Sequence, residues 1–199
     1  SVSLTTGRSQ TTWSGVVELT ESYTVNVTDE LIITACTVVK LANSARLFVD
    51  GRILVQGDSS CAVTLETINT GLHYGIQFNQ SSYGRGSIVD NLSIVNSMYG
   101  VTIYGSNPAL NNVTVVNPSR VAVDLFSSAT PTIRDLVVDQ AGRGFSYADW
   151  RYGIGLSVGA GSAPVVERAV LSDMRIRGLN IWGDSGGIFS GVTIDNVTA

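Results

Sequence analysis

The sequence is poor in charge and in several reactive residue types, and each shortage excludes a class of protein. Charged residues make up only 14% of the 199 residues, which is low for a soluble helical protein. The formal net charge is −4 and no basic run occurs, so we expect no nucleic-acid partner. No stretch is long and apolar enough to span a bilayer as a helix, so we expect no membrane insertion. His73 is the sole histidine and no metal-binding motif occurs, so no metal and no cofactor are expected.

The residue types that are abundant in the chain favour strands and turns. Hydrophobic residues make up 44%, there are 21 glycines but only 4 prolines, and Val, Ile, Ser, Thr and Asn are abundant. A length of 199 residues favours a single domain. The sequence starts at Ser1 rather than Met, which indicates a mature form or an excised fragment.

One phrase of about ten residues recurs along the second half of the chain, with little identity but a constant pattern. Two of its copies read "NPALNNVTVV" and "TPTIRDLVVD". The central apolar residues of five copies are 21, 23, 33 and 23 positions apart: Leu92, Val113, Leu136, Ala169 and Val192. Apolar residues alternate with polar ones around each centre, which is typical of strands. A repeat of this length with short strands predicts an all-β solenoid whose coils stack in parallel.

A second run of alternating residues predicts a second set of stacked strands. Its first inward positions are Ile76, Val101, Val123, Ile154 and Leu179. The next inward positions are Phe78, Ile103, Leu125, Leu156 and Ile181. Before each central residue of the first phrase we expect a sharp corner in left-handed backbone conformation, at Asn91, Asn112, Asp135, Arg168 and Gly191. Arginine is the poorest fit in that list.

The N-terminal half resembles the first coils of many secreted and cell-surface β-helix proteins. The match lies in the segment "ARLFVDGRILVQG", where Leu47, Val49, Gly51, Leu54 and Gly57 fit that pattern. The whole chain resembles right-handed parallel β-helix proteins with repeats of the pectate-lyase type. The resemblance implies a right-handed, single-stranded helix of about seven coils, each of about 22–25 residues. We expect residues 1–24 to form an N-terminal cap or first-coil segment and residues 25–199 to form the β-helix.

The two cysteines are expected to form a disulfide. Cys36 precedes Val38 by two residues and Cys61 precedes Val63 by two, so the repeat places both at one corner of adjacent coils. Stacked coils bring equivalent Cα atoms to about 4.8 Å, within disulfide range. The alternative is a pair of small buried thiols. A disulfide indicates an oxidising compartment, so we expect a secreted or cell-surface protein.

Five asparagines start N-x-S/T triplets and are candidates for glycosylation: Asn26, Asn79, Asn91, Asn112 and Asn196. The alternative is structural, because corners favour Asn and outward strand positions favour Ser or Thr.

No catalytic residue is predicted. The clustered carboxylates of polysaccharide-cleaving enzymes have no counterpart, and Asp124 is expected to be a solvated strand residue. His73 is expected to be a packed or surface residue rather than a base.

The candidate binding residues are aromatic. Tyr104, Phe126 and Trp182 take outward strand positions and form a strip suited to stacking on sugar rings or to contact with a protein. An insertion, residues 142–153, lies beside the strip. It contributes Phe145, Tyr147, Asp149, Trp150 and Arg151. Alternatively, its aromatic side chains fold back onto Phe126 and Trp182 as a small satellite core.

These features predict a structural or adhesive extracellular module that binds a polysaccharide or a cell-surface protein. One alternative is a fragment of a polysaccharide lyase or glycoside hydrolase. Another is a subunit that self-associates through its coil ends into a filament or matrix.

Overall fold

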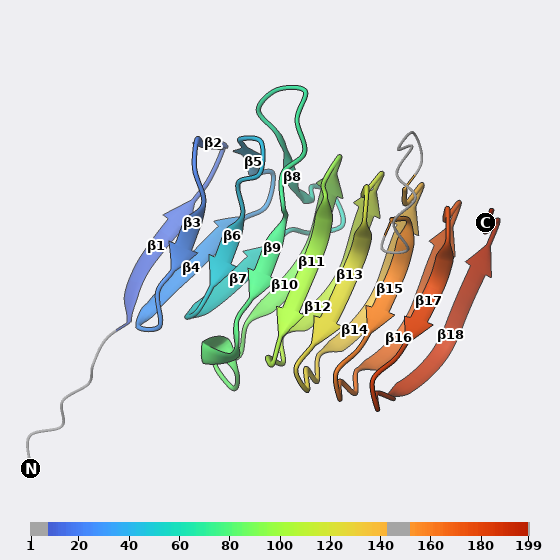
Figure 1. Cartoon of the computed structure of the whole chain (residues 1–199). Helices are drawn as coiled ribbons and strands as arrows, with labels where there is room; N and C mark the ends of the chain where they lie inside the picture. The colour runs from blue at the N-terminus through green and yellow to red at the C-terminus, as the bar shows by residue number, and fades with distance from the viewer. Residues whose placement is uncertain (1–7, 143–151, 199) are drawn as a thin grey trace, which may run out of the picture.

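The chain folds into a parallel β-solenoid of stacked turns (Figure 1). The structure, a computed structural model, describes residues 8–142 and 152–198. Two sheets run along the solenoid, and the strands that pair within them are parallel. The only helical element in the described residues is the 3₁₀ turn η1 (Gln80–Ser82). The all-β parallel solenoid predicted from the repeat is therefore confirmed.

Sheet A contains one strand from each turn along its main path. In order these are β1 (Ser9–Trp13), β4 (Asp29–Thr34), β7 (Arg52–Gln56), β10 (Ile88–Val95), β12 (Ala109–Val116), β14 (Thr132–Asp139), β16 (Val165–Ser172) and β18 (Ile188–Asp195). It also holds β2 (Val16–Leu19), β5 (Val38–Leu41) and β8 (Val63–Thr67). Sheet B consists of β3 (Tyr23–Val25), β6 (Leu47–Val49), β9 (Ile76–Phe78), β11 (Tyr99–Tyr104), β13 (Val121–Phe126), β15 (Ile154–Val158) and β17 (Arg177–Ile181).

The described chain makes about eight turns, one more than the sequence predicts. The additional turn comes from the segment expected to be a cap or first coil: β1 pairs with β4, and β2 pairs with β5. Trp13 of β1 packs on the core and meets the ring of Tyr23 at 4.9 Å. Residues 9–25 therefore form a complete first turn.

The core is a set of aliphatic ladders that run the length of the solenoid. Leu92 pairs with Val113, Val113 with Leu136 and Leu136 with Ala169, so the predicted central column is confirmed. These four side chains are at most 1% exposed. Each large aliphatic side chain buried in this way contributes roughly 1.5–3 kcal/mol, which makes the ladders the main source of stability.

The predicted corners are also present. The five corner residues all have left-handed backbone, with φ of 49° at Asn91, 53° at Asn112, 54° at Asp135, 58° at Arg168 and 62° at Gly191. Each corner bends one long strand. In β10, the residues before the corner pair with β7 and the residues after it pair with β8. Arg168 fits this column because its guanidinium forms two hydrogen bonds with the carboxylate of Asp135, of 2.6 and 2.9 Å.

The register of sheet B differs from the prediction after the insertion. Val123 pairs with Leu156, and Val121 pairs with Ile154, so the expected match of Val123 with Ile154 is wrong by two residues. A column of small residues marks the true register: Gly75, Gly100, Ala122, Gly155 and Gly178. A Cβ on Gly155 would lie 2.7 Å from the carbonyl oxygen of Gly178, so this column must stay small.

The predicted disulfide joins Cys36 to Cys61, with a Cα–Cα distance of 5.1 Å. Val38 pairs with Thr64 rather than Val63, so the cysteines are offset by one residue and do not occupy identical positions. The left-handed backbone of Cys36, with φ of 65°, is the corner of its own turn. The bond links the β4–β5 connection to the β7–β8 connection and thereby ties two adjacent turns together.

Candidate ligand-binding groove

A polar column forms the floor of a groove on the outer face of sheet B. The side chains that alternate with the inward ladder lie in register from turn to turn: Gln77, Thr102, Asp124, Ser157 and Asn180. The predicted match of Val123 with Ile154 would have put Gly155 beside Asp124, whereas the observed register puts Ser157 there. The floor therefore offers hydroxyl, amide and carboxylate groups along five consecutive strands, which is typical of a surface that hydrogen-bonds a polar ligand.

Aromatic residues two positions further along the strands form the first wall. Tyr104 pairs directly with Phe126, and Tyr104 and Trp182 are 49% and 41% exposed. The rings of Phe126 and Trp182 are 6.0 Å apart and nearly perpendicular, at 70°. Between them lies Gly159, the residue after Val158 in the intervening turn. The predicted strip of three aromatic residues therefore exists, and it forms one continuous edge.

Tyrosine and arginine side chains form the opposite wall. The guanidinium carbon of Arg46 lies 5.1 Å from the ring of Tyr74 and 5.6 Å from that of Tyr99. Arg120 donates hydrogen bonds of 3.0 Å to the hydroxyls of Tyr99 and Tyr152. Cations held against ring faces in this way are stabilised by the quadrupole of the rings. The wall is therefore rigid and positively charged.

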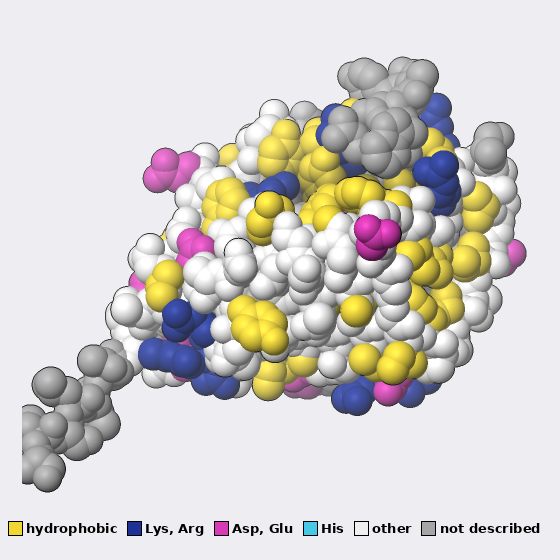
Figure 2. Space-filling model, turned by 60° about the horizontal axis from the view of Figure 1, so that its bottom comes forward, with side chains coloured by type: hydrophobic (Ala, Val, Ile, Leu, Met, Phe, Trp, Pro, Cys, Tyr) yellow, Lys and Arg dark blue, Asp and Glu magenta, His cyan; other side chains and the backbone are white. Residues whose placement is uncertain are grey.

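Two adjoining cavities occupy the space between the walls. One has a volume of about 420 Å³ and is lined by Arg46, Gln77, Tyr99, Thr102, Tyr104, Asp124 and Phe126. The other has about 290 Å³ and is lined by Tyr99, Val121, Asp124, Phe126, Ile154, Ser157 and Trp182. They share Tyr99, Asp124 and Phe126, so they form one groove. In Figure 2, hydrophobic side chains gather towards the upper middle of the face shown, with Lys and Arg side chains beside them.

Asp124 is not the solvated residue that the sequence suggests. It is only 5% exposed and lies in the middle of the groove floor, where both cavities meet. It is the one carboxylate among the residues that line these two cavities. Acid–base cleavage of a glycosidic bond requires two carboxyl groups, so the described part of the groove lacks that pair.

His73 is packed, as expected, and lies away from the groove lining. It is fully buried, its Nε2 hydrogen-bonds the carbonyl oxygen of Val95 at 3.1 Å, and the amide of Gly75 donates to its Nδ1 at 3.0 Å. Burial lowers the pKa of His73 to about 4, so the ring is neutral at physiological pH. Both ring nitrogens form hydrogen bonds with backbone groups, so the imidazole has a structural role.

The insertion residues Phe145, Tyr147, Asp149, Trp150 and Arg151 lie outside the described residues. The described part of the insertion, Gly142, Tyr152 and Gly153, borders the groove through Tyr152, whose hydroxyl accepts from Arg120. Ligand binding by the insertion, and the alternative of a satellite core, stay predictions.

The five sequon asparagines all use their side-chain amides within the fold. Asn26 donates to Asp29 at 2.9 Å and Asn79 donates to Asp50 at 3.0 Å. Asn91 donates to the carbonyl oxygen of Gly57 at 3.0 Å, Asn112 donates to Asn91, and Asn196 donates to Asp173. Asn91, Asn112 and Asn196 also adopt left-handed backbone. These contacts support the structural interpretation of the triplets, and glycosylation stays a prediction.

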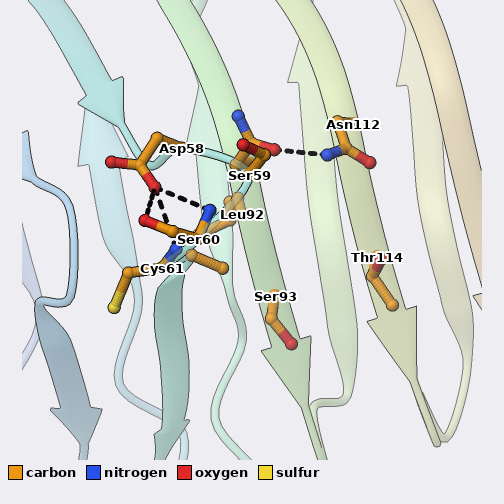
Figure 3. A pocket seen from close by; sticks show the side chains of 10 residues that line it. Asp58, Ser59, Ser60, Cys61, Leu92, Ser93, Asn112 and Thr114 are labelled. Carbon is orange, nitrogen blue, oxygen red and sulfur yellow. Dashed lines mark hydrogen bonds between the residues drawn. The ribbon is translucent and has the colours of Figure 1, made fainter.

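A separate cavity, of about 340 Å³, lies beside the disulfide and is lined by Asp58, Ser60, Cys61, Asn91 and neighbouring residues (Figure 3). One carboxylate oxygen of Asp58 accepts hydrogen bonds from the amide and hydroxyl of Ser60, of 2.8 and 2.6 Å, and from the amide of Cys61, of 2.9 Å. The bond from the Ser60 hydroxyl contributes most to lowering the pKa of Asp58. The Asp58 carboxylate is already hydrogen-bonded within its own loop, so the groove on sheet B is a stronger candidate binding site than this cavity.

Sequence reasoning missed the tyrosine–arginine wall. A signal was present, because a Tyr-Gly pair stands just before β9 and β15, at Tyr74 and Tyr152, and at the start of β11, at Tyr99. Nothing in the sequence separates Arg46 and Arg120 from other surface arginines, since their role depends on which rings stack beside them.

No family model, curated protein or solved structure matches this chain significantly. Across residues 8–142 and 152–198, no three metal-ligating side chains of the His, Cys, Asp or Glu type cluster together. The same ranges hold no helix that is long and apolar enough to cross a membrane. The structure thus establishes a β-solenoid with a disulfide, and membership of the pectate-lyase-like family stays a prediction.

Proposed function

We propose that this chain is an extracellular β-solenoid module that binds a glycan chain in the groove on sheet B. The observation that carries the proposal is the combination of an aromatic wall, Tyr104, Phe126 and Trp182, with the polar floor that includes Gln77 and Thr102. Sugar rings present apolar faces and polar edges, so they match a site with rings on one side and hydrogen-bonding groups below. The disulfide supports the extracellular location.

Binding to an oligosaccharide array tests this proposal, with the Trp182→Ala and Phe126→Ala variants beside the parent protein. Removal of a stacking ring is expected to weaken binding about tenfold or more, which corresponds to about 1.4 kcal/mol. Val170→Ala is the matched control, because Val170 is a 44% exposed apolar residue on sheet A. Equal affinity of the parent and both aromatic variants would contradict the proposal.

Two other functions are less well supported. A polysaccharide-cleaving enzyme would need a second carboxyl group near Asp124, and none lines the described groove. Release of new sugar ends on incubation with polysaccharides would favour this alternative.

Self-association is favoured by a different observation. In the last turn, Ile194 of β18 is 46% exposed, although it pairs with the fully buried Leu171, so a further turn or another copy would bury it. Concentration-dependent growth in size-exclusion chromatography, abolished by Ile194→Lys, would favour assembly.

A further inference from the structure

Two guanidinium groups flank one tyrosine ring in the groove wall. The guanidinium carbon of Arg46 lies 5.6 Å from the ring centre of Tyr99, and that of Arg120 lies 5.9 Å from it. Each arginine is also fixed by hydrogen bonds: Arg46 donates to the carbonyl oxygen of Tyr74 at 3.2 Å and to the side chain of Gln77. The two positive charges are therefore held at set positions beside the same ring.

Neither of these arginines forms an ion pair with a carboxylate in the described part of the chain. Other arginines do: Arg52 pairs with Glu30, Arg134 with Glu167 and Arg168 with Asp135. The formal net charge of the chain is −4, so carboxylates are in excess. Arg46 and Arg120 are thus two cations beside the groove that no carboxylate of the described residues pairs with, in a protein that is acidic as a whole.

The guanidinium of Arg46 is partly withdrawn from water in the wall of the groove. Burial lowers the pKa of Arg46, while its contacts with Tyr99 and Tyr74 oppose this shift. A partly desolvated cation gains most from a counter-charge, because hydrogen bonds between ionised partners are about twice as strong as neutral ones. An anionic ligand would supply the counter-charge that no carboxylate of residues 8–142 and 152–198 gives to Arg46.

Thr102 provides a second, independent indication of a ligand. Its side chain belongs to the floor of the cavity that Arg46 also lines, and Thr102 pairs with Gln77 of the neighbouring strand. Thr102 is 8% exposed, and its hydroxyl has no hydrogen-bond partner within the described residues. Buried polar groups normally find a partner, so a hydroxyl that lines a cavity and lacks one is suited to a ligand. Asp124 also lines this cavity and interacts with a group other than Arg46. Within the described residues, Arg46 and Asp124 form no ion pair.

We infer that the groove selects glycans that carry an anionic substituent, a carboxylate or a sulfate, which binds between Arg46 and Thr102. Arg120, whose guanidinium carbon lies 5.9 Å from the centre of the Tyr99 ring, adds a second positive charge near this subsite. The inference rests on the proposed glycan binding and makes it more specific. The same chemistry accepts either anion, so the experiment must separate the two.

The test uses pairs of oligosaccharides that share one backbone and differ only in a carboxylate or a sulfate group. We expect the parent protein to bind at least one anionic member about tenfold more tightly than its neutral counterpart, with an affinity that falls as salt rises. Comparison of the carboxylated with the sulfated member identifies the anion.

Three variants locate the effect. Arg46→Gln and Thr102→Val are each expected to abolish the preference, so that one variant binds the anionic and the neutral member with affinities within about twofold of each other. Arg134→Gln removes the same charge from sheet A, where Arg134 pairs with Glu167, and is expected to keep the preference. Unchanged circular dichroism spectra and unfolding midpoints show that Arg46→Gln is folded, and Thr102→Val supplies a second, nearly isosteric probe.

The outcomes separate this inference from the proposed function. Equal binding of neutral and anionic members would overturn the anion subsite and leave glycan binding intact. A preference that survives in both Arg46→Gln and Thr102→Val would also overturn it, because the anion would then bind elsewhere. Failure of every oligosaccharide to bind would overturn the proposed function and the inference together.

Discussion

The ring of Trp182 lies 6.0 Å from the ring of Phe126, although a complete turn of the solenoid separates their strands. This contact exists because the residue between them is Gly159: a Cβ there would lie only 2.2 Å from Cε2 of Trp182. Because Gly159 has no side chain, the rings of Phe126 and Trp182 pack together into a single wall although their turns are not adjacent.

Substitution of Gly159 by alanine is therefore expected to displace the indole of Trp182 and to separate it from Phe126. The fluorescence of Trp182 should shift and glycan binding should weaken about tenfold, because the wall loses its continuity. Gly186→Ala is the matched control, since a Cβ there meets nothing within 4 Å. Comparable effects of both substitutions would show that the contact at Gly159 is not the cause.

Loss of the disulfide is expected to lower stability by about 3 kcal/mol, the entropy estimate for a loop with ends 25 residues apart. Urea unfolding of the Cys36→Ser/Cys61→Ser double variant measures the change as a lower midpoint. The parent protein in reducing conditions should behave like the double variant. The double variant itself should not respond to reductant, and a response would point to an effect unrelated to this bond.

Stability is expected to depend on pH through His73. Its pKa in the folded chain, about 4, is lower than its ordinary value of 6.5, so between these values the unfolded chain binds a proton that the folded chain excludes. The contribution of His73 is complete above pH 6.5 and declines as pH falls towards 4, by up to about 3 kcal/mol. Unfolding of the parent and of His73→Gln at pH 7 and pH 4 isolates this contribution from that of the carboxylates.

An NMR titration provides a direct check, because the chain contains a single histidine. Its ring signals should stay constant from pH 8 to about 5 in the folded protein. A midpoint near 6.5 would show that the imidazole is accessible to water.

Leu136→Ala is expected to destabilise the chain by about 2–5 kcal/mol, since Leu136 is fully buried in the central ladder. Val137→Ala, at the next residue, should cost far less because Val137 is 37% exposed on the opposite face of the same strand. Similar losses for the two variants in urea unfolding would mean that the ladder is not the core.

The corner at Asn112 separates backbone strain from side-chain contacts. Asn112→Ala and Asn112→Gly both delete the amide that donates to Asn91, but only glycine adopts the φ of 53° without strain. We expect alanine to be less stable than glycine by about 1 kcal/mol. Equal stabilities in thermal unfolding would indicate that the corner relaxes in the alanine variant.

The elements that repeat were the ones that the sequence could predict. Leu92, Val113 and Leu136 have equivalent neighbours in every turn, so periodicity alone assigns them to one ladder. The corner residues follow the same logic, because left-handed backbone recurs at one place in each turn.

The elements that break the repeat could not be predicted in this way. Tyr152 and Gly153 look like Tyr99 and Gly100, which suggested a register that is wrong by two residues, whereas close packing places Gly155 beside the Gly100 column. The burial of Asp124 and the roles of Arg46 and Arg120 depend on side chains from several turns, and no local pattern encodes them.

The groove runs from Arg46, next to β6, to Trp182, which follows β17, and spans six strands or about 24 Å at the usual spacing of paired strands. Its two ends differ in chemistry, with a fixed cation at one and an exposed indole at the other. A polymer bound along the solenoid axis would therefore meet different groups at the two ends of the groove. Reversal of the polymer would place its charged unit against the indole, so the solenoid would distinguish the head of a bound chain from its tail.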